Sequence, residues 1–378
     1  MRGRSTSGVR PRVLYVAGQL GAGGAEHQLM LLLRRMRDGP IEPAVAVWEY
    51  DSTDDLVAAV RELGIPLYGT AARGSARKLE YLVRTARLIR PDYVHSTLFF
   101  TNLPSWVAAT ASGARQSVGS VRADYWSERR DAGRVKGPLS SWRPPDIIAN
   151  SRAAAGIISQ DRSLLRPSRV VVVPNAVDTD AFRPSDVPEH VSSAGRAVRL
   201  LGVGRLVPTK RWAWLIERLA EMEAKSALPP WHLRICGEGP ERSSIQSAIE
   251  RAKLTDRVSL LGLRSDVSVQ MTNTDILVHV STSEGTPNAV AEALSCGVPV
   301  LSTAVGDVGE LMTDAVEGFL LRPDDEIGFR SRLQQLACDR NLRKAMGARG
   351  RLRMVTERGP DRLVDNTLGA YRHFGWEV

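Results

Sequence analysis

The sequence predicts an α/β protein with two Rossmann-like, doubly wound domains. Short apolar runs alternate with helical stretches along the chain, which is typical of mainly parallel sheets covered by helices on both faces. The chain has 378 residues, and one domain holds roughly 100–200. The stretch 182–196 is polar, contains prolines and has no periodicity, and the alternation starts again after it. We therefore expect a linker at this point.

In the first half, each predicted strand is a short apolar run and each helix has a start or stop signal. Pro91, for example, ends one helix, and Ser151 caps another. The predicted strands are residues 11–17, 44–48, 65–68, 93–95, 117–121, 147–150 and 170–173. The predicted helices are residues 27–36, 54–63, 78–90 and 102–111, with one more after Ser151.

The second half repeats the pattern. The predicted strands are residues 198–203, 232–236, 258–261, 276–280, 298–301 and 318–321. The predicted helices are residues 212–224, 243–253, 289–294, 326–354 and 363–374. In both halves, ligands are expected at the carboxyl ends of the strands, as in other sheets of this kind.

Two carboxylates lie in one strand–turn–helix unit, residues 281–311. Glu284 is at the mouth of the turn and Glu292 is inside the helix. Eight helical residues place them about 12 Å apart and turned by roughly 80°. That separation is too large for a coupled acid/base pair and suits the two ends of an elongated polar ligand. The helix N-terminus between them favours an anion. An ordinary βαβ unit with solvated glutamates remains the alternative.

A basic loop follows the first strand of the second half. Arg205 and Lys210 offer one planar fork and one point charge, which suits a diphosphate. A solvated loop is the alternative. In the first half, a Gly-rich loop runs from Gly18 to Glu26 and suits the approach of a phosphate. Glu26 stands where a dinucleotide fingerprint needs its third Gly, so a nicotinamide site is not expected. The alternative is a tight turn without a ligand.

Two polar residues end strands in the first half. His95 is either a catalytic residue or a structural one with satisfied hydrogen bonds. Arg122 cannot act as a base near neutral pH, but it can hold an anion or a sugar hydroxyl.

Composition limits the class of protein. No run of about 18 apolar residues is present, so no transmembrane helix is expected, and the basic first ten residues lack the apolar core of a secretory signal. Three distant cysteines and six scattered histidines predict no metal site and fit a reducing cytoplasm. The net charge of +9, concentrated at 115–143 and 330–362, favours an anionic membrane surface or anionic substrates, or reflects Arg-rich genomic composition. No nucleic-acid motif accompanies it.

The unit around Glu284 resembles the signature of the retaining glycosyltransferases of family four, which have the GT-B fold. The shared pattern is S-x-x-E-G-x-P-N-x-x-x-E-A-x-x-x-G-x-P-V. G-R-L-x-x-x-K at Arg205 and G-G-x-E at Glu26 are also similar to family motifs, and the resemblance covers roughly residues 13–374. It implies two Rossmann-like domains facing a cleft, with a last helix that packs back on the first domain.

The resemblance also implies a role for each matching residue. Glu284 would bind hydroxyls of the donor sugar, Glu292 the ribose, and Arg205 with Lys210 the diphosphate. Arg122 stands where many members carry a His, and this departure puts the usual role of that His in doubt. His95 is the remaining candidate catalytic residue, and Glu26 with Arg122 would lie on the acceptor side. The further donor-binding candidates are Gly23, Gly24, Gly204, Gly237, Val267, Gly285, Thr286, Pro287 and Asn288.

The expected function is metal-independent, retaining transfer of a hexosyl group from a UDP- or GDP-sugar. The acceptor would be a glycan, a lipid-linked saccharide or a natural product, and no cofactor is needed. A sugar-nucleotide epimerase and an inactive binding module are the alternatives. We expect a cytoplasmic protein in contact with the inner face of the membrane and no nucleic-acid partner. The expected segments are a disordered lead (1–10), an acceptor-side domain (11–183), a linker (184–196), a nucleotide-sugar domain (197–355) and a returning helix (356–378).

Overall fold

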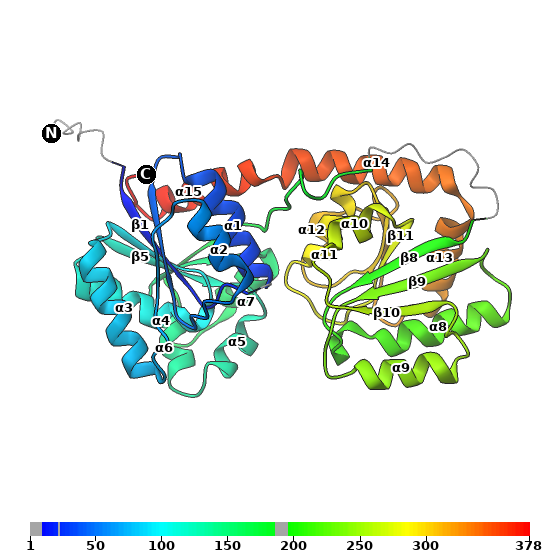
Figure 1. Cartoon of the computed structure of the whole chain (residues 1–378), viewed down its shortest axis with the longest axis horizontal. Helices are drawn as coiled ribbons and strands as arrows, with labels where there is room; N and C mark the ends of the chain where they lie inside the picture. Colours follow the sequence, from blue (N-terminus) through cyan, green and yellow to red (C-terminus); the bar gives the residue numbers. More distant parts are fainter. Residues whose placement is uncertain (1–9, 22, 186–195) are drawn as a thin grey trace. The chain divides into compact units, whose positions relative to one another are not determined.

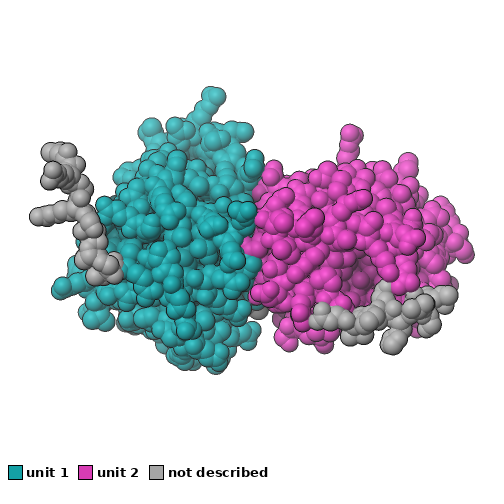
Figure 2. All heavy atoms as spheres, turned by 90° about the horizontal axis from the view of Figure 1, so that it is seen from above, with its two compact units in different colours: residues 1–176, 360–378 teal, residues 177–359 magenta. Residues whose placement is uncertain are grey.

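The computed structural model describes residues 10–21, 23–185 and 196–378. Most of the predicted lead and of the predicted linker lies outside these residues. The chain forms two compact units, and the C-terminal segment belongs to the first (Figure 1 and Figure 2). Unit 1 comprises Met1–Ala176 and Pro360–Val378, and unit 2 comprises Val177–Gly359.

Unit 1 is built on a parallel sheet of seven strands in the order β3-β2-β1-β4-β5-β6-β7. The first strand is the apolar run RVLYVA, in which Val13 and Tyr15 pack on one face while Leu14 and Val16 pack on the other. Both faces are therefore covered by helices, as the continuous apolar pattern predicts. The strands are β1 (Arg12–Ala17), β2 (Glu42–Val47), β3 (Leu67–Gly69), β4 (Tyr93–Ser96), β5 (Gln116–Val121), β6 (Asp146–Ala149) and β7 (Arg169–Val172).

The helices of unit 1 follow the strands in alternation. Side chains at Asp124 and Ser151 cap two of them by accepting hydrogen bonds from backbone N–H groups of the first turn. The helices are α1 (Gly24–Met36), α2 (Asp55–Glu62), α3 (Ser75–Ile89), η1 (Phe99–Thr101), α4 (Asn102–Ser112), α5 (Tyr125–Asp131), α6 (Lys136–Trp142), α7 (Arg152–Gln160) and α15 (Pro360–His373).

Helix α15 confirms the prediction that the chain returns to the first domain. It lies beside α1 (Figure 1), and its Tyr371 hydroxyl donates to the Tyr15 hydroxyl at 3.2 Å. Trp376, just beyond the helix, stacks on Tyr93 of β4 with ring centroids 4.3 Å apart. The last residues of the chain are therefore part of the core of unit 1.

Unit 2 contains a second parallel sheet, of six strands in the order β10-β9-β8-β11-β12-β13. The strands are β8 (Val198–Val203), β9 (Trp231–Cys236), β10 (Val258–Gly262), β11 (Ile276–His279), β12 (Val300–Thr303) and β13 (Gly318–Leu321). The helices are η2 (Pro208–Lys210), α8 (Trp212–Ala224), α9 (Arg242–Arg251), α10 (Val267–Thr272), α11 (Asn288–Ser295), α12 (Val308–Leu311), α13 (Glu326–Cys338) and α14 (Arg340–Glu357). Together the two sheets confirm the predicted α/β class with two doubly wound units.

Besides shifts of one to three residues at the ends of elements, the predicted and the observed elements differ in three ways. Strand β12 begins at Val300 and not at Val298, because Val298 N–H bonds back to Ala293 O at the end of α11. The predicted helix 326–354 is two helices, since Asp339 interrupts it and caps the second by accepting from Leu342 N–H. Helices α5, α6, α10 and α12 and the single turns η1 and η2 are short and were not predicted.

Each sheet has one point at which the strand order reverses direction along the chain. In unit 1 the first strand lies between β2 and β4, and in unit 2 β8 lies between β9 and β11. Ligands of doubly wound sheets bind in the crevice outside the carboxyl ends of the strands at such a point. The loops that follow β8, β9 and β11 are therefore where a ligand of unit 2 is expected.

Gly347 offers a test of the packing that carries α11. Its place in α14 brings the helix so near to Gly297, at the end of α11, that a Cβ on Gly347 would lie 1.9 Å from Gly297 O. We expect Gly347→Ala to destabilise the protein by about 1–3 kcal/mol, as overpacking does. Chemical denaturation measures the change.

Gly369→Ala in α15 is the matched control, because a Cβ there meets no atom within 4 Å. Replacing this helical Gly is expected to stabilise the protein by roughly 0.5–1 kcal/mol. Equal stability of the two variants would contradict the close packing of α14 on α11.

Candidate functional site

Three loops at the carboxyl edge of the unit 2 sheet are in direct backbone contact. Gly204 N–H donates to Cys236 O at 3.0 Å, and Gly237 N–H donates to Gly262 O at 2.8 Å. A Cβ on Gly237, whose φ is +151°, would lie 1.9 Å from Gly204 O. Only Gly fits at this position. The loops after β8, β9 and β10 thus bring two of the predicted glycines, Gly204 and Gly237, together.

The two predicted cations lie in the loop after β8. Arg205 is exposed, and in the described part of the chain its guanidinium makes no hydrogen bond or ion pair, although its carbonyl accepts from Trp212 Nε1 at 3.0 Å. Lys210 ends η2, and its side chain runs past Gly204, whose Cβ would lie 3.0 Å from Lys210 Cε. The free fork of Arg205 can receive an anionic ligand without breaking an existing ion pair.

Glu284 is the centre of a buried polar cluster. Its Oε1 accepts from Lys210 Nζ at 2.5 Å and lies 3.0 Å from His279 Nε2, and the Lys210 and Glu284 side chains are only 17% and 14% exposed. Burial alone would raise the pKa of Glu284, but the hydrogen bond from His279 and the charge of Lys210 outweigh it and hold the pKa at about 2. The carboxyl is therefore ionised at neutral pH, and none of the described residues donates a hydrogen bond to its Oε2.

His279 is a member of this cluster that was not among the predicted site residues. Burial lowers its pKa, so the ring is neutral. A carboxylate at Nε2 requires a proton on that nitrogen, so Nδ1 is the acceptor that faces Ser302 Oγ at 2.9 Å. The same hydroxyl lies 2.9 Å from Thr303 O, and Ser281 Oγ lies 3.2 Å from Nε2. The signal in the sequence was a lone ionisable residue at the carboxyl end of an otherwise apolar strand, β11.

The turn between Glu284 and α11 is held by the neighbouring loop after β12. Asp307 N–H donates to Gly285 O at 2.9 Å, and Gly306 packs so closely that a Cβ there would lie 2.3 Å from the same oxygen. Pro287 is buried and is the residue that precedes α11. Residues 285–288, including Thr286 and Asn288, therefore form a fixed entrance to the helix, whose N-terminus favours an anion.

Glu292, the second predicted carboxylate, has a different environment. It is half-buried in α11, and its carboxyl makes no hydrogen bond or ion pair with any residue that the structure describes. Burial raises its pKa to about 7. Glu284 thus lies at the entrance of the helix and has a lowered pKa, whereas Glu292 lies inside the same helix and has a raised pKa.

Val267, the predicted contact of the nucleotide base, is the first residue of α10. It is half-buried and packs on a cluster that includes Val290 and Ala291 of α11. The turn before it is held by Arg264, whose Nε donates to Asp266 Oδ1 at 2.7 Å. This connects the loop after β10 to the helix that carries Glu292.

The remaining predicted residues form a second group, in unit 1. Glu26 is buried in the first turn of α1, and its carboxyl folds back on Gly23, where a Cβ would lie 2.1 Å from Glu26 Oε2. Gly24, at the start of α1, is the next residue of this turn. Burial raises the pKa of Glu26. A side chain at position 23 would therefore displace the Glu26 carboxyl from its present place.

His95 is buried at the end of β4. Its Nδ1 lies 2.6 Å from the Tyr371 hydroxyl and its Nε2 lies 3.3 Å from Ser120 Oγ. Burial, assisted by the charge of Arg122, lowers its pKa to about 3, so the ring is neutral at physiological pH. Both ring nitrogens have partners, which matches the structural alternative as well as a catalytic one.

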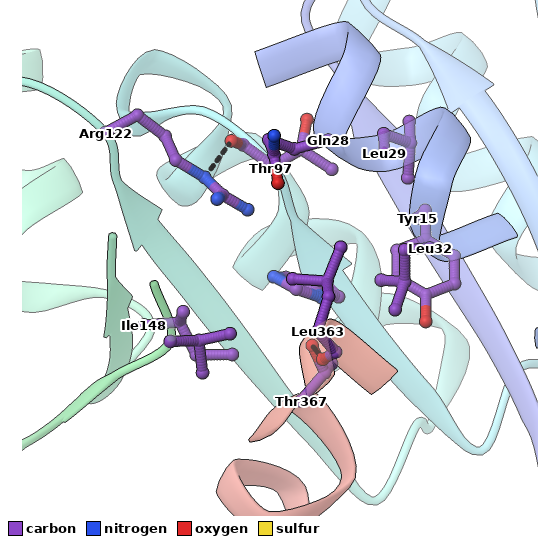
Figure 3. Close-up of a pocket in the computed structure, with 11 residues that line it drawn as sticks. Tyr15, Gln28, Leu29, Leu32, Thr97, Arg122, Ile148, Leu363 and Thr367 are labelled. Atoms are coloured by element: carbon purple, nitrogen blue, oxygen red, sulfur yellow. Dashed lines mark hydrogen bonds between the residues drawn. The ribbon is translucent and has the colours of Figure 1, made fainter. Parts of the chain in front are cut away.

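Arg122 and His95 line the same small cavity, of about 10 Å³, which has room for about one water. Figure 3 shows Arg122 at this cavity with its hydrogen bond to Thr97. Within the described ranges the guanidinium makes two long hydrogen bonds and no other, from Nε to Thr97 O at 3.4 Å and from Nη1 to Asn175 Oδ1 at 3.5 Å. Burial lowers the pKa of Arg122, and the nearby Glu128 and Glu26 carboxyls oppose this effect. The group in unit 1 is therefore polar and largely buried, and its cation, Arg122, is held by long hydrogen bonds.

The predicted site residues thus fall into two groups. Unit 2 brings together the residues around Glu284 and the Gly-rich loops: Gly204, Arg205, Lys210, Gly237, Val267, Glu284, Gly285, Thr286, Pro287, Asn288 and Glu292. Unit 1 holds Gly23, Gly24, Glu26, His95 and Arg122. In the described ranges no helix is long and apolar enough to cross a membrane.

Comparison with known proteins identifies the class. The family model Glycosyl transferases group 1 matches residues 189–353, and the model Glycosyltransferase Family 4 matches residues 22–181. Both matches contain the motifs on which the predicted site rests. The chain belongs to the family-four, group 1 glycosyltransferases, as its sequence pattern predicted.

Individual relatives cover parts of the chain. One subunit of the human phosphatidylinositol N-acetylglucosaminyltransferase is 36% identical over 155 residues, which are 40% of this chain and 31% of that protein. The UDP-Gal:alpha-D-GlcNAc-diphosphoundecaprenol alpha-1,3-galactosyltransferase of Escherichia coli is 28% identical over 182 residues, 47% of each chain. The matched stretches thus span less than two thirds of these curated relatives.

A solved structure shows the same fold along nearly the whole chain. Anabaena Alr3699/HepE, in complex with UDP and glucose, superposes with a TM-score of 0.78 at 20% identity, over 96% of this chain and 100% of the other. The fold of the chain is therefore GT-B.

Glu292→Gln tests the unusual carboxyl in α11. Because the folded-state pKa is raised to about 7 from about 4.5, the carboxyl costs stability that grows as pH rises from about 4.5 to 7. We expect Glu292→Gln to raise the melting temperature at pH 8 and to leave it close to the wild-type value at pH 5. Thermal unfolding at both pH values measures this.

Glu250→Gln is the control, because Glu250 is exposed on α9 of the same unit. Its melting temperature should follow the wild type at both pH values. The raised pKa would be contradicted if the difference in melting temperature between Glu292→Gln and the wild type were the same at pH 8 as at pH 5.

Proposed function

We propose that the protein transfers a hexosyl group from a UDP-sugar to an acceptor hydroxyl, with retention of configuration at the anomeric carbon. The observation that carries this proposal is the ion pair between the Glu284 carboxylate and Lys210, in the loop that also holds Arg205, whose guanidinium has no partner among the described residues. A carboxylate that accepts hydroxyls suits the sugar of a nucleoside diphosphate sugar, and two cations that bind phosphates suit its diphosphate. UDP and glucose are bound by the structurally similar Alr3699/HepE, which supports this choice of donor.

Arg205 and Lys210 would act on the leaving group. When the bond from the anomeric carbon to the diphosphate breaks, negative charge grows on the departing oxygen. Fixed positive groups stabilise that charge in the transition state without reorganisation at the moment of reaction. We propose that these two cations, and no metal ion, carry out this step. Arg205 is free to bind, and Lys210 offers three N–H groups that can serve a phosphate and Glu284 together.

The rest of the donor would follow the helix that separates the two carboxylates. Glu284 would accept hydroxyls of the hexose, with backbone groups of residues 285–288 close by, and Glu292 would accept the ribose hydroxyls. Val267 would lie against the base, while Gly204 and Gly237 allow the backbone to approach the phosphates. The free carboxyl of Glu292 supports this arrangement, because it has no competing partner among the described residues.

The group in unit 1 is proposed to serve the acceptor and the reacting sugar. Glu26, His95 and Arg122 would supply polar contacts, and Gly23 with Gly24 would let the loop approach the donor. Two relatives carry a lipid-linked substrate in their names, a phosphatidylinositol and a diphosphoundecaprenol saccharide. We infer a lipid-linked saccharide as the acceptor class, with the transfer taking place at the cytoplasmic face of a membrane.

Arg205→Ala tests the leaving-group role. We expect turnover with the native donor to fall by on the order of 10²-fold or more, because a charge that stabilises the transition state is removed. Arg251→Ala, an exposed arginine of α9 in the same unit, should leave turnover unchanged. Thermal shifts with a panel of sugar nucleotides first identify the donor, since binding raises the melting temperature with RT ln(1 + [L]/Kd).

An NMR time course of the identified donor separates the classes of reaction. Transfer requires the acceptor, whereas epimerisation or hydrolysis consumes the donor without one. Loss of activity in EDTA would overturn the metal-independent step. Glu284→Ala with nearly wild-type turnover would overturn the assignment of the sugar site.

We also propose that unit 1 makes the contact with an anionic membrane. Unit 1 contains 27 Lys and Arg against 18 Asp and Glu, a net charge of +9, whereas unit 2 contains 24 of each. The whole positive excess of the chain therefore belongs to unit 1, including the basic region 115–143. Arg130, Arg134 and Lys136 are exposed around α5 and α6, with Trp126 and Val135 exposed beside them. Basic and aromatic side chains together favour an anionic lipid surface.

Charge reversal tests the membrane contact. We expect the triple variant R130E/R134E/K136E to lose most of its binding to vesicles that contain anionic lipid, since each basic residue near the surface contributes about 1 kcal/mol. K225E/R251E/K253E, at exposed positions of unit 2, is the matched control and should bind as the wild type does. Co-sedimentation at two salt concentrations measures both. Equal binding by the two variants would contradict the placement of the contact on α5 and α6.

A further inference from the structure

We propose that His279 is the positioning residue that holds the Glu284 carboxylate in place while Lys210 engages the donor diphosphate. The inference rests on the proposed function of Glu284 and goes beyond it, because it assigns a task to a residue outside the predicted site. His279 would touch neither the sugar nor the phosphates. It would act through one hydrogen bond, from Nε2–H to Glu284 Oε1.

The geometry of the cluster supports a fixed donor. His279 ends β11, and its register partner on the neighbouring strand β12 is Ser302. Side chains at paired positions of neighbouring strands point to the same face, so Ser302 Oγ reaches Nδ1 at 2.9 Å. The side chain of His279 is only 4% exposed. Held from behind on a rigid strand, the imidazole offers its other nitrogen to Glu284 at 3.0 Å in one orientation.

Lys210 is a different kind of partner. It is the last residue of a single turn of 3-10 helix, and its charge is carried at the end of a flexible four-carbon stem. In the proposed reaction Lys210 must also serve a diphosphate with two negative charges. A diphosphate competes with Glu284 for the same ammonium group. His279 is buried and does not serve the diphosphate. Its Nε2 also faces Ser281 Oγ, but at 3.2 Å against 3.0 Å for Glu284 Oε1, so the bond to Oε1 remains when the attraction of Lys210 is shared.

The loss of that bond has a defined electrostatic consequence. The titratable groups that face Glu284 are His279 from β11 and Lys210 from η2, while the loop after β12 approaches its turn through the backbone of Gly306. Burial by itself raises the pKa of Glu284, and the hydrogen bond from His279 is the strongest opposing effect. Without it, Glu284 would take up a proton at higher pH and would no longer accept sugar hydroxyls with both oxygens.

A purely structural role is the competing interpretation, and the chain contains a matched example of one. His232 of β9 also bonds a serine of the neighbouring strand, with Nε2 3.2 Å from Ser259 Oγ. No carboxylate is its partner among the described residues. If His279 were only another His–Ser pair between strands, its replacement and that of His232 would have the same consequences.

The experiment compares His279→Leu, His279→Gln and His232→Leu. His279→Leu removes the donor, and His279→Gln keeps an N–H at the end of the side chain. We expect His279→Leu to lower kcat by on the order of 10- to 100-fold, as removal of a hydrogen bond to a charged group does. We expect the acid limb of the kcat/KM profile to move to higher pH in this variant. In His279→Gln, kcat and the acid limb of the kcat/KM profile should return most of the way to their wild-type values. His232→Leu should leave kcat and the profile unchanged.

A second readout does not depend on turnover. NMR of carboxyl-labelled protein, with the Glu284 signal identified by its loss in Glu284→Gln, follows the titration of this group directly. In the wild type and in His232→Leu, Glu284 should remain ionised down to pH 4. In His279→Leu it should titrate above pH 4, and added UDP should raise the midpoint further by engaging Lys210. A variant that does not fold is replaced by Ser302→Ala, which removes the support of the ring and should give a smaller shift of the same sign.

The outcomes distinguish the two proposals. A Glu284 titration that is the same in His279→Leu and in the wild type overturns the positioning role, whatever the activity. A wild-type protein without transfer activity overturns the proposed function, while the NMR titration still decides whether His279 controls Glu284. Unchanged kcat in a folded His279→Leu variant would also contradict the inference.

Discussion

The burial of one ionised carboxylate is the constraint on which the unit 2 site depends. A charge that is largely removed from water needs charged or hydrogen-bonding partners close by. Glu284 finds them in Lys210, from the loop after β8, and in His279, from the end of β11. The ion pair thereby ties two loops that are 74 residues apart in the sequence. The position of the phosphate-binding loop and the position of the sugar-binding carboxylate are therefore set by the same contact.

The loops around this pair have little freedom to separate. Residues of β8, β9 and β10 meet backbone to backbone through Gly204, Gly237 and Gly262, with no side chains between them. The N–H groups of Gly204 and Gly237 are both used in these contacts, which hold the three loops together. The cations are added at the rim, Arg205 in solvent and Lys210 half-buried. The arrangement places positive charge where a leaving diphosphate would need it. The apolar core of the unit lies beneath these loops.

Most of the fold could be predicted from the sequence because both sheets are parallel and buried on two faces. Their strands are continuous apolar runs, and β13 was predicted residue for residue at 318–321. The errors arose where tertiary contacts decide the local structure or the partners of a side chain. Val298 has the apolar character of a strand residue, yet its N–H completes the end of α11. His279 interrupts the apolar run of its strand, and no pattern in the chain shows that Ser302 and Glu284 lie beside it.

The two glutamates of the signature show how one short segment supplies two different chemistries. Both are partly buried, so burial raises the pKa of each. At Glu284 a hydrogen bond and a cation reverse this effect, and at Glu292 nothing opposes it. Glu284 is thus a permanent acceptor, whereas Glu292 exchanges a proton near neutral pH. If a ribose binds the ionised form of Glu292, donor binding must release a proton at pH 6, and donor affinity must rise between pH 6 and 8 by linkage. The spacing of the pair, which the sequence contains, says nothing of this difference, because it comes from partners on other strands.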